Sequence, residues 1–379
     1  MKLGELIAPS GKRAGAETAP VYSVTKHHGF VRSDKYFTKR VFSDDLSSYK
    51  LVQKGDFAYA TIHLDEGSIG RAPESALISP MYTVFTVDDS RVDPGYLLRY
   101  MKSPIALQRY ATLGRGTAER RKSISLDSLG RLDVPLPPLP EQRRIAAILD
   151  EADALRTKRR ESLELFEALA PTRVSELIKT HQSAETRRLG EVAEVQGGLT
   201  VNARRSSNPV TAEYLRVANV FRGRIDLTEV KTIGVTEAEV ERVALRQNDL
   251  LVVEGHGNED EVGRVARWVE SSAPMVHQNH LIRVRVIEGF EPAFVEHYLN
   301  STAGRRYFRS VAKTTSGLNT INVSSVRAVP IPDVPLSGQR AFADEIAALH
   351  PVREWLSADL RTLDTLFASL QHRAFTGRL

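Results

Sequence analysis

Several short segments carry residue types that enzymes use, but each lacks a necessary companion. The glycine-rich segment GHGNEDEVG (255–263) has no Gly-Lys-Ser/Thr ending and is therefore not a P-loop. The segment HQNH (277–280) places two histidines three residues apart without another clear ligand, which favours structural histidines over zinc ligands. Asp249 and Glu254 resemble nuclease carboxylates, but no lysine follows in an acid-x-Lys pattern. Neither an Asn/Asp-Pro-Pro-aromatic motif nor a methyltransferase-type glycine loop is present, so we predict no catalytic residue and no metal site.

Clusters of basic residues indicate a different chemistry, the binding of phosphate groups. Residues 26–40 hold five Lys/Arg and two His against one acid, and residues 115–122 hold four basic residues against one acid. Phe30, Tyr36 and Phe37 lie within the first cluster, and basic residues mixed with aromatic ones suit a nucleic-acid backbone. A solvated protein face is the alternative that composition leaves open.

The candidate contacts of the first half are Lys26, His28, Arg32, Lys35, Lys39, Arg40, Arg115, Arg120, Arg121 and Lys122. Those of the second half are Arg204, Arg205, Arg222, Arg224 and Lys313, with Asn319 as a candidate base reader. Arginine forks pair with guanine or phosphate, whereas lysine acts mainly as a point charge. Most such contacts go to phosphate, so the sequence does not say which residues read bases.

Length and composition restrict the class of protein. The chain has 379 residues, which suits two domains of ordinary size, and 41% hydrophobic with 26% charged residues is typical of a globular protein. It has no cysteine, which excludes disulfides, thiolate metal sites and cysteine nucleophiles. No apolar run approaches the roughly 20 residues that span a bilayer. We therefore expect a cytoplasmic protein without a membrane partner.

The elements that position these residues occur twice, because the sequence is an internal duplication. Five blocks match in the same order in both halves, and loops of different length account for the drifting offset between them. The pairs are KLGEL (2–6) with RLGEV (188–192), YKLVQKGDFAYA (49–60) with RVALRQNDLLVVE (242–254), IGRAP (69–73) with VGRVA (262–266), VDPGYLLRYMKS (92–103) with FEPAFVEHYLNS (290–301), and LELFEAL (163–169) with LDTLFASL (363–370). The second pair aligns Asp56 with Asp249, and the fourth aligns Tyr100 with Tyr298.

Each half reads as a globular domain followed by a long helix. Short apolar alternations such as YTVFTV (82–87) and LIRVRVI (281–287), mixed with helical patches, predict an α/β or α+β domain. A proline-rich strap then begins each helix: VPLPPLPEQRR (134–144) and VPIPDVPLSGQR (329–340). Polyproline runs are extended and semi-stiff, so we expect each strap to fix the pose of a domain on its helix. The expected parts are domain 1 (1–137), a central helix (138–185), domain 2 (186–332) and a C-terminal helix (333–379).

The two helices carry apolar stripes at heptad spacing, which predicts that they pair with each other in an antiparallel coiled coil. Arg159 and Ser162 interrupt the central stripe, Arg353 is the polar residue of the C-terminal stripe, and Pro351 is expected to kink it. The predicted pairing residues are Ile145, Ile148, Ala152, Leu155, Phe166 and Leu169 of the central helix, and Phe342, Ile346, Leu349, Leu356, Leu360, Leu363, Phe367 and Leu370 of the C-terminal helix. A rod of about 35–40 residues is about 50–60 Å long.

The block VPLPPLPEQRRIAAILDEADAL, the duplication and the terminal LFASLQHRAFTGRL together resemble the specificity subunit of type I restriction–modification systems. Residues 25–70 also resemble the first recognition domain of that family. The resemblance implies two target recognition domains, each reading one half of a split, asymmetric site in double-stranded DNA, held apart by two antiparallel helices related by a pseudo-two-fold axis. It implies that the helices dock two methyltransferase subunits, which bring S-adenosylmethionine and methylate adenine at N6. Restriction subunits, with ATP and Mg, would add endonuclease activity, and the specificity subunit itself would be non-catalytic.

Two other functions stay open at this point: an autonomous DNA methyltransferase or nuclease, and a scaffold that binds nucleic acid without sequence preference. One departure from the repeat also bears on docking. The first half has Glu141 before Gln142, whereas the second half has Gly338 before Gln339. The missing acid weakens the predicted helix start there and the expectation that both methyltransferase subunits dock equally.

Overall fold

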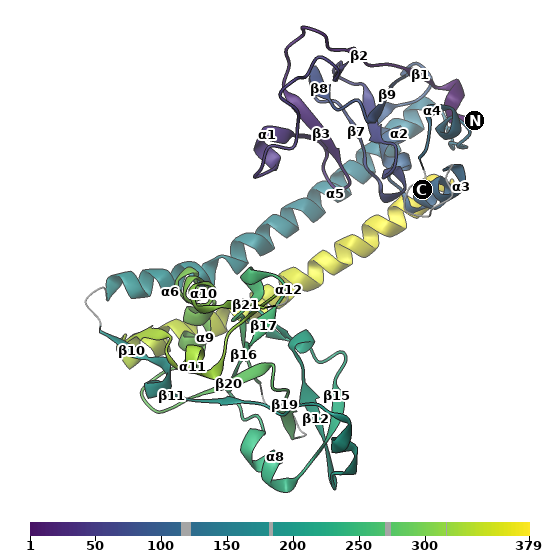
Figure 1. Ribbon diagram of the computed structural model, residues 1–379. Helices are drawn as coiled ribbons and strands as arrows, with labels where there is room; N and C mark the ends of the chain where they lie inside the picture. The colour runs from purple at the N-terminus through teal and green to yellow at the C-terminus, as the bar shows by residue number, and fades with distance from the viewer. Residues whose placement is uncertain (115–122, 182–184, 270–273, 316) are drawn as a thin grey trace. The chain divides into compact units, whose positions relative to one another are not determined.

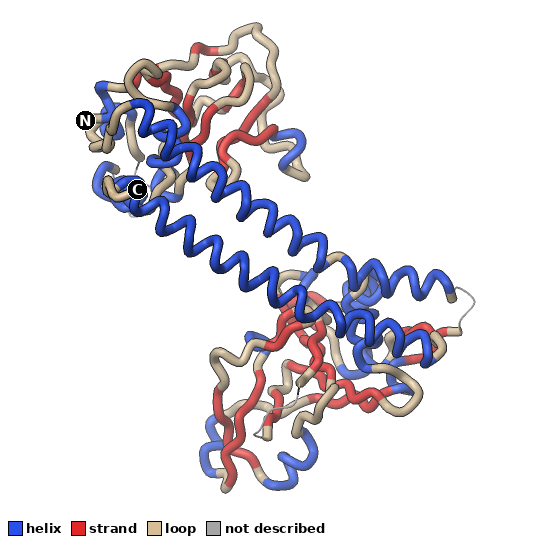
Figure 2. Tube along the Cα trace, turned by 180° about the vertical axis from the view of Figure 1, so that it is seen from behind, coloured by secondary structure: helices blue, strands red, loops and turns tan. Residues whose placement is uncertain are grey.

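The computed structural model describes residues 1–114, 123–181, 185–269, 274–315 and 317–379. These residues group into two compact units, the first formed by Met1–Arg160 with Ala358–Leu379 and the second by Glu161–Ser357 (Figure 1). Each unit contains one globular domain of mixed helices and strands together with parts of the long helices, which Figure 2 draws in blue. The predicted α+β fold with two similar domains is therefore confirmed. No helix in these ranges is long and apolar enough to span a membrane.

The domain of the first unit contains two sheets. The first sheet has the order β1 (Ile7–Pro9), β9 (Tyr82–Val87), β6 (Phe57–Ala60) and β7 (Ile69–Arg71), with all pairs antiparallel. The second has the order β2 (Lys12–Arg13), β5 (Lys50–Val52), β8 (Ala76–Ile78), β3 (Val21–Thr25) and β4 (Gly29–Arg32), and in it β3 runs parallel to β8. The helices are α1 (Ser33–Tyr36), α2 (Pro94–Met101), α3 (Pro104–Leu113) and α4 (Leu126–Leu129). Asp93 and Ser103 cap α2 and α3 ahead of a proline at the first helical position, which is a typical helix start.

The domain of the second unit repeats this arrangement. Its four-stranded sheet has the order β11 (Ala193–Gly197), β20 (Leu281–Val286), β16 (Leu250–Val253) and β18 (Val265–Arg267). A three-stranded sheet has the order β15 (Lys231–Val235), β12 (Val210–Leu215) and β19 (Met275–His277), and β12 runs parallel to β19 as β3 does to β8. The smaller pairings are β10 (Thr186–Arg188) with β23 (Pro330–Pro332), β13 (Val220–Phe221) with β14 (Arg224–Ile225), and β17 (Gly255–His256) with β22 (Leu318–Thr320) and β21 (Lys313–Thr315). The helices are α7 (Leu189–Val192), α8 (Glu237–Val243), α9 (Pro292–Asn300), α10 (Thr302–Val311) and α11 (Val323–Arg327).

Individual hydrogen bonds repeat as well as strands. The Tyr100 hydroxyl donates to the Asp133 carbonyl at 2.6 Å, and the matching Tyr298 hydroxyl donates to the Pro330 carbonyl at 2.7 Å. Asp56 and Asp249 are both buried, and each carboxylate accepts from the backbone N–H three residues earlier in the turn before a central strand. These bonds confirm the alignment of the tyrosines and of the aspartates.

One of the five matched blocks is displaced in the structure. The match of IGRAP with VGRVA pairs Ile69 with Val262, but Ile69 begins β7 and its counterpart β18 begins at Val265. In the sheets, Phe57 lies opposite Arg71 and Leu250 lies opposite Arg267. The second half therefore has three more residues before this strand. The sequence similarity of IGRAP and VGRVA led to an alignment without this insertion.

Each domain is joined to its strap by its own first residues. Leu3 donates a backbone hydrogen bond to Leu132, and Leu189 donates one to Val329, both at 2.8 Å. Two prolines occupy β23, which is tolerated because this strand pairs on one side only, with β10.

A buried glutamine then fixes each strap to its helix. The Oε1 atom of Gln142 accepts from the Asp93 N–H at 2.8 Å, and its Nε2 donates to the carbonyls of Pro137 (2.8 Å) and Arg91 (3.2 Å). In the second unit, Gln339 Oε1 accepts from the Glu291 N–H at 2.9 Å, and Nε2 donates to the Val334 carbonyl at 2.7 Å. Both glutamines are at most 1% exposed. The glutamine of the repeated Gln-Arg pair is therefore a clamp between domain and helix.

The long helices differ in one respect from the prediction. The expected continuous central helix is two helices, α5 (Leu139–Glu167) and α6 (Leu169–Thr180). Pro171 explains the break, because its ring clashes with the carbonyl four residues earlier, which is that of Glu167. The C-terminal helix α12 (Leu336–Phe375) is continuous and has Pro351 inside it. Its start at Leu336 shows that Gly338, in place of an acid, does not prevent the helix from beginning.

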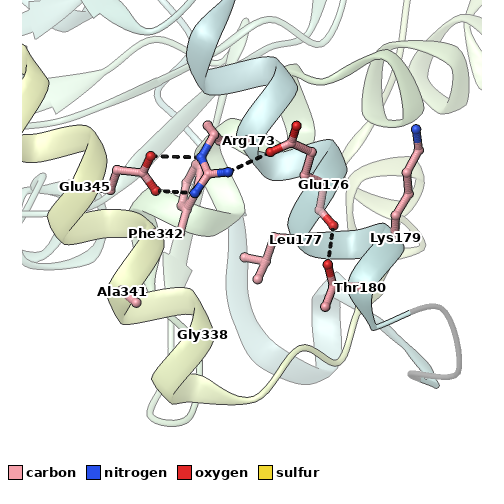
Figure 3. Close-up of a pocket in the computed structure, with 9 residues that line it drawn as sticks. All are labelled: Arg173, Glu176, Leu177, Lys179, Thr180, Gly338, Ala341, Phe342 and Glu345. Atoms are coloured by element: carbon pink, nitrogen blue, oxygen red, sulfur yellow. Dashed lines mark hydrogen bonds and ion pairs between the residues drawn. The ribbon is translucent and has the colours of Figure 1, made fainter.

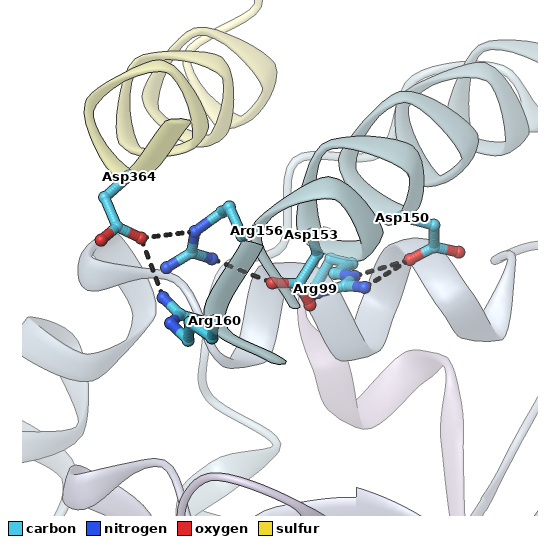
Figure 4. Close-up of polar contacts among 6 residues, drawn as sticks. All are labelled: Arg99, Asp150, Asp153, Arg156, Arg160 and Asp364. Carbon is cyan, nitrogen blue, oxygen red and sulfur yellow. Dashed lines mark hydrogen bonds and ion pairs between the residues drawn. The ribbon is translucent and has the colours of Figure 1, made fainter. Parts of the chain in front are cut away.

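In the first unit, α5 and α12 pack antiparallel through ion pairs. Arg156 contacts Asp364 at 2.7 Å and Arg159 contacts Asp359 at 2.6 Å, so the contacts advance along α5 as they recede along α12. Arg160 also reaches Asp364 (Figure 4). Arg156 lies 4.2 Å from the ring centroid of Phe367. Arg159, which interrupts the apolar stripe in the sequence, thus has its own carboxylate on the other helix.

In the second unit, α6 and the first half of α12 pack in the same antiparallel sense. Arg173 of α6 forms a bidentate pair with Glu345 of α12 at 2.8 and 3.0 Å and also contacts Glu176 (Figure 3). Glu345 holds the pKa of Arg173 above its ordinary value through this hydrogen bond, and the same bond lowers the pKa of Glu345. Arg353, the polar residue of the C-terminal stripe, lies 3.4 Å from Glu167. The antiparallel packing predicted for the helices is present within each unit.

The burial of the predicted pairing residues varies. Ile145, Ala152, Phe342 and Leu356 are buried, and the half-buried ones are Ile148, Phe166, Ile346, Leu349, Leu360, Leu363, Phe367 and Leu370. Leu155 and Leu169 are instead 49% and 40% exposed, so the prediction was wrong for these two. Leu149, which the heptad phase missed, is fully buried against the core of the first domain. The central helix therefore turns its apolar face toward a domain as much as toward the other helix.

Candidate nucleic-acid interface

The first basic cluster forms one surface at the tip of the β3–β4 hairpin and on α1. Gly29 adopts a left-handed backbone conformation in the turn, with a φ of 61°, so Lys26 and His28 stand on a tight hairpin. The His28 ring meets the Tyr36 ring edge-on at 5.7 Å, which connects the hairpin to the short helix. Lys26, His28, Lys35, Lys39 and Arg40 are exposed, and Arg32 is half-buried. We refer to these six residues as the hairpin surface.

Part of the positive charge on the hairpin surface is already paired. Arg32 forms a bidentate contact with Asp34, which raises the pKa of Arg32 and lowers that of Asp34. Arg40 contacts Asp44 at 2.5 Å. Lys35 and Lys39 form no ion pair with any residue in the described ranges, so their charges face solvent without a carboxylate.

The second predicted cluster of the first half falls outside the described residues. Arg115, Arg120, Arg121 and Lys122 all belong to residues 115–122, and their assignment stays a prediction.

In the second unit, two of the predicted arginines already have partners inside the domain. Arg205 donates to both carboxylate oxygens of Glu239 at 3.0 Å and to the Thr200 carbonyl at 2.5 Å, and its side chain is 14% exposed. Arg222 donates to Asn300 Oδ1 at 3.1 Å and to the Asp260 carbonyl at 2.7 Å. Both arginines brace neighbouring loops, and a contact with nucleic acid would have to use their remaining N–H groups.

Other predicted residues of the second unit are available at the surface. Arg204 is exposed, and Arg224 is 50% exposed above the Phe221 ring, 4.5 Å from its centroid. Lys313 and Asn319 lie on the adjacent strands β21 and β22. The Asn319 amide accepts from the Thr314 hydroxyl at 2.7 Å and donates to the Gly257 carbonyl at 3.4 Å. In this sheet Asn319 pairs with Thr314 and Lys313 pairs with Thr320, so the lysine and the amide lie on opposite faces of the β21–β22 pair.

Helix α10 supplies basic residues that the sequence reasoning missed. Arg305 and Arg309 both contact Asp260, and Arg306 is exposed. The signal was present in the segment GRRYFR (304–309), because residues one turn apart on a helix share a face.

A comparison with known protein families finds a match in the first half of the chain. Residues 8–165 match the family "Type I restriction modification DNA specificity domain". This part of the chain is therefore similar to that family. The match covers the first domain, its strap and most of α5, and the repeated sheets and clamps carry the same design through the second half.

The chain is also similar to curated type I specificity subunits. The chain is 23% identical over 309 residues to the type I restriction enzyme StySPI specificity subunit of Salmonella potsdam, covering 76% of this chain and 66% of the relative. It is 20% identical over 307 residues to the EcoKI specificity subunit of Escherichia coli K12, covering 75% and 65%. The matches thus span slightly less than two thirds of each relative.

Two solved structures share the fold. One was described under "Structural basis underlying complex assembly and conformational transition of the type I R-M system", with a TM-score of 0.57, 17% identity and coverage of 100% of this chain and 97% of that one. The other is the type I restriction–modification S subunit from M. genitalium, with a TM-score of 0.55, 15% identity and coverage of 99% and 95%.

The residues that resembled enzyme or metal sites form hydrogen bonds and ion pairs within the second domain. His277 is fully buried on β19, and its Nδ1–H donates to the Leu281 carbonyl at 3.0 Å. His280 points elsewhere, to the Glu254 carboxylate at 3.0 Å. Asp249 accepts both N–H groups of the Arg285 guanidinium at 2.7 Å. Within the described ranges, no three histidine, aspartate or glutamate side chains are grouped as a metal ion requires.

Burial of His277 predicts that the second domain is sensitive to acid. Burial, with a smaller effect of Arg283, lowers the pKa of His277 to about 4 from an ordinary value of 6.5. As the pH falls, His277 is protonated in the unfolded chain before it is protonated in the folded one. The free energy of unfolding is therefore highest above pH 6.5 and decreases as the pH drops toward 4. The loss should approach about 3 kcal/mol for this residue. Urea unfolding followed through the fluorescence of Trp268, which is buried in the same unit, measures it between pH 7 and pH 4.5.

The control for this prediction is His277→Asn, whose side-chain N–H can replace the bond to Leu281 without titrating. The variant should be less stable at pH 7 but should show a shallower dependence on pH. An unchanged slope would contradict the assignment to His277.

Proposed function

We propose that this chain is the DNA-recognition subunit of a type I restriction–modification complex, in which each domain reads one half of a split, asymmetric site in double-stranded DNA. The observation that carries the proposal is one fold built twice in a single chain, with different side chains on the two candidate surfaces. Two equal domains would read equal half-sites. Unequal domains, mounted on the same kind of clamp and helix, require half-sites that differ in sequence.

We further propose that the long helices dock two methyltransferase subunits, which bring S-adenosylmethionine for adenine-N6 methylation, and that restriction subunits with ATP and Mg add cleavage. The chain itself would bind and orient DNA without an active site of its own. Support comes from the similarity of residues 8–165 to the specificity-domain family and from the partners of His277, Asp249 and Glu254, which bond these side chains to the domain itself.

Exchange of the second domain tests the two-reader proposal. Residues 186–332 of this chain would be replaced by those of another member of the family, and the methylated sites of cells carrying the hybrid and its methyltransferase would be sequenced. Only one half of the recognised site should change, because the first domain is untouched. A change in both halves, or in neither, would refute the proposal.

The unpaired lysines of the hairpin surface give a prediction about salt dependence. Replacing Lys35 and Lys39 by glutamine should weaken binding to specific and scrambled duplexes alike, because lysine acts as a point charge on phosphate. The slope of log K against log salt should become shallower by about 1 for each phosphate that is no longer neutralised. Fluorescence anisotropy between about 50 and 200 mM salt measures the slope. Lys179, an exposed lysine of α6, provides the control: Lys179→Gln should leave the slope unchanged.

An assay of the purified chain distinguishes the recognition subunit from an autonomous enzyme. With duplex DNA and labelled S-adenosylmethionine, the chain alone should transfer no methyl group, and transfer should begin when methyltransferase subunits are added. Turnover by the chain alone would favour the autonomous methyltransferase.

A further inference from the structure

The second unit contains a cavity of about 460 Å³ between helix α9 of its domain and the long helices. Its lining includes the apolar side chains of Phe166, Leu169, Ile346 and Leu349. It also includes the polar and cationic side chains of Arg222, Arg267, His297 and Arg353. We call this space the α9–α12 cavity. A cavity of this size, with apolar walls and a few convergent polar groups, is typical of a small-molecule site.

The same position in the first unit is closed by ion pairs. Arg99 of α2, the counterpart of α9, contacts Asp150 and Asp153 of α5, each at 2.7 Å, and Asp153 also contacts Arg156 at 2.9 Å (Figure 4). With Arg160 and Asp364, the cluster contains three arginines and three aspartates, a net charge of zero. These pairs fasten the first domain to its helix.

The duplication shows which residues replace this cluster in the second unit. The alignment that matches Tyr100 with Tyr298 places His297 at the position of Arg99. The alignment of the clamp glutamines, Gln142 with Gln339, places Ala347 and His350 at the positions of the two aspartates. Arg353 stands at the position of Arg156. The second unit therefore keeps an arginine of the cluster without the two aspartates, and this arginine contacts Glu167 at 3.4 Å and Glu354 at 3.6 Å instead.

The charges that line the α9–α12 cavity are correspondingly unbalanced. Three arginines face two glutamates, Glu167 and Glu296, which gives a net charge of +1 before either histidine takes a proton. Arg222 has only neutral acceptors, Asn300 Oδ1 and the Asp260 carbonyl. Its pKa is lowered by burial and by the nearby Arg305, which marks a site where an added negative charge is stabilised.

We propose that the α9–α12 cavity binds a small organic anion, whose carboxylate or phosphate head takes the place of the missing aspartates and whose compact apolar body packs on Phe166 and Ile346. The guanidinium groups of Arg222 and Arg353 provide planar donor pairs, which match both kinds of head group. A bound anion touches α9 on one side and α12 on the other. It therefore fastens the second domain to its helix as the ion pairs fasten the first, and makes that domain's pose dependent on a ligand.

Titration of the full chain tests the proposal with defined probes. Isothermal calorimetry would compare phenyl phosphate and benzoate, which carry the two head groups on one ring, with benzyl alcohol and inorganic phosphate, which each lack one part. One site per chain should saturate with phenyl phosphate or benzoate, and the better of the two identifies the head group. Saturation by neither ring anion, or equal binding of benzyl alcohol, would overturn the proposal.

Variants locate the site. Arg353→Gln and Arg222→Gln should each lower the affinity for the tighter-binding probe by about 10- to 100-fold, the usual effect of removing a hydrogen bond to a charged group. Arg340→Gln is the matched control, because Arg340 is an exposed arginine of α12 outside the cavity. The affinity of this variant for the probe should not change. The triple variant H297R/A347D/H350D rebuilds the first-unit cluster, and it should abolish binding without lowering the melting temperature. Unchanged binding in the triple variant would place the ligand elsewhere and refute the proposal.

A measurement on the unmodified chain covers the case in which a variant fails to fold. With ¹³C-labelled histidine, the ring signals of His297 and His350 should shift on saturation, whereas those of His256 and His280, which lie on other surfaces, should not. Saturable binding without a shift of His297 and His350 would refute the site.

Discussion

Replacement of Phe375 by alanine is expected to lower the free energy of unfolding of the first unit by about 3–5 kcal/mol, the usual effect of truncating a buried phenylalanine. Phe375 is 6% exposed, and its ring meets Tyr96 and Tyr100 edge-on with centroids 5.6 and 5.3 Å apart. The change leaves a cavity where the end of α12 enters the core of the first domain. The last turns of α12 should then detach from that domain.

Both tryptophans, Trp268 and Trp355, belong to the second unit, and this makes the measurement specific. Urea unfolding of the Phe375→Ala variant should show an early transition in far-UV circular dichroism, whereas the fluorescence transition stays in place. Leu366→Ala, on the same helix with 47% of its surface exposed, should cost less than about 1 kcal/mol. Coincident transitions shifted together in the Phe375 variant would contradict the separate packing of the two units.

Replacement of Gln142 by alanine is expected to cost about 2–4 kcal/mol, because it leaves the N–H of Asp93 and the carbonyls of Pro137 and Arg91 buried without their partner. The loss should appear in circular dichroism and not in tryptophan fluorescence, since the clamp belongs to the first unit.

The duplication supplies the matched variant. Gln339→Ala removes the equivalent clamp of the second unit and should shift the fluorescence of Trp268 instead. Arg143→Ala is the control, because Arg143 is exposed beside Gln142 and should be nearly neutral. If Arg143→Ala costs as much as Gln142→Ala, the clamp is not the source of the effect.

The duplication was visible in the sequence because its most informative residues have strict environments. The hydroxyls of Tyr100 and Tyr298 each donate to a backbone carbonyl, and Gln142 and Gln339 each satisfy several backbone groups. These residues are therefore the same in both halves, whereas neighbouring residues differ. The strand segments 82–87 and 281–286 were also predicted, although each buries consecutive residues, Val84 with Phe85 and Leu281 to Val284, instead of alternate ones.

The phase and the continuity of the central helix were less predictable. Heptad spacing selected Ile148 and Leu155, but the helix also faces a domain, and that second contact buries Leu149 and leaves Leu155 exposed. The apolar stripe of a helix does not by itself show whether the helix packs on a domain or on the other long helix. The break after Glu167 was readable from Pro171, because the clash of a proline with the carbonyl four residues earlier is a local property.

The candidate contacts show what composition leaves out. A count of arginines does not reveal that Arg205 faces Glu239 or that Arg222 faces Asn300, since these partners are 34 and 78 residues away along the chain. The basic residues of 26–40 do gather on one hairpin, because they are close in sequence. Which of them contact DNA remains a prediction.

The first unit is assembled from two separated stretches of chain, Met1–Arg160 and Ala358–Leu379, whereas the second is one continuous stretch. During translation, the ribosome therefore synthesises all of the second unit before it adds Phe375. A nascent first domain must wait with Tyr96 and Tyr100 incompletely covered, and a premature stop codon before position 375 would leave them so permanently. Cells should accordingly degrade such truncated products through the first domain, even though the second can fold.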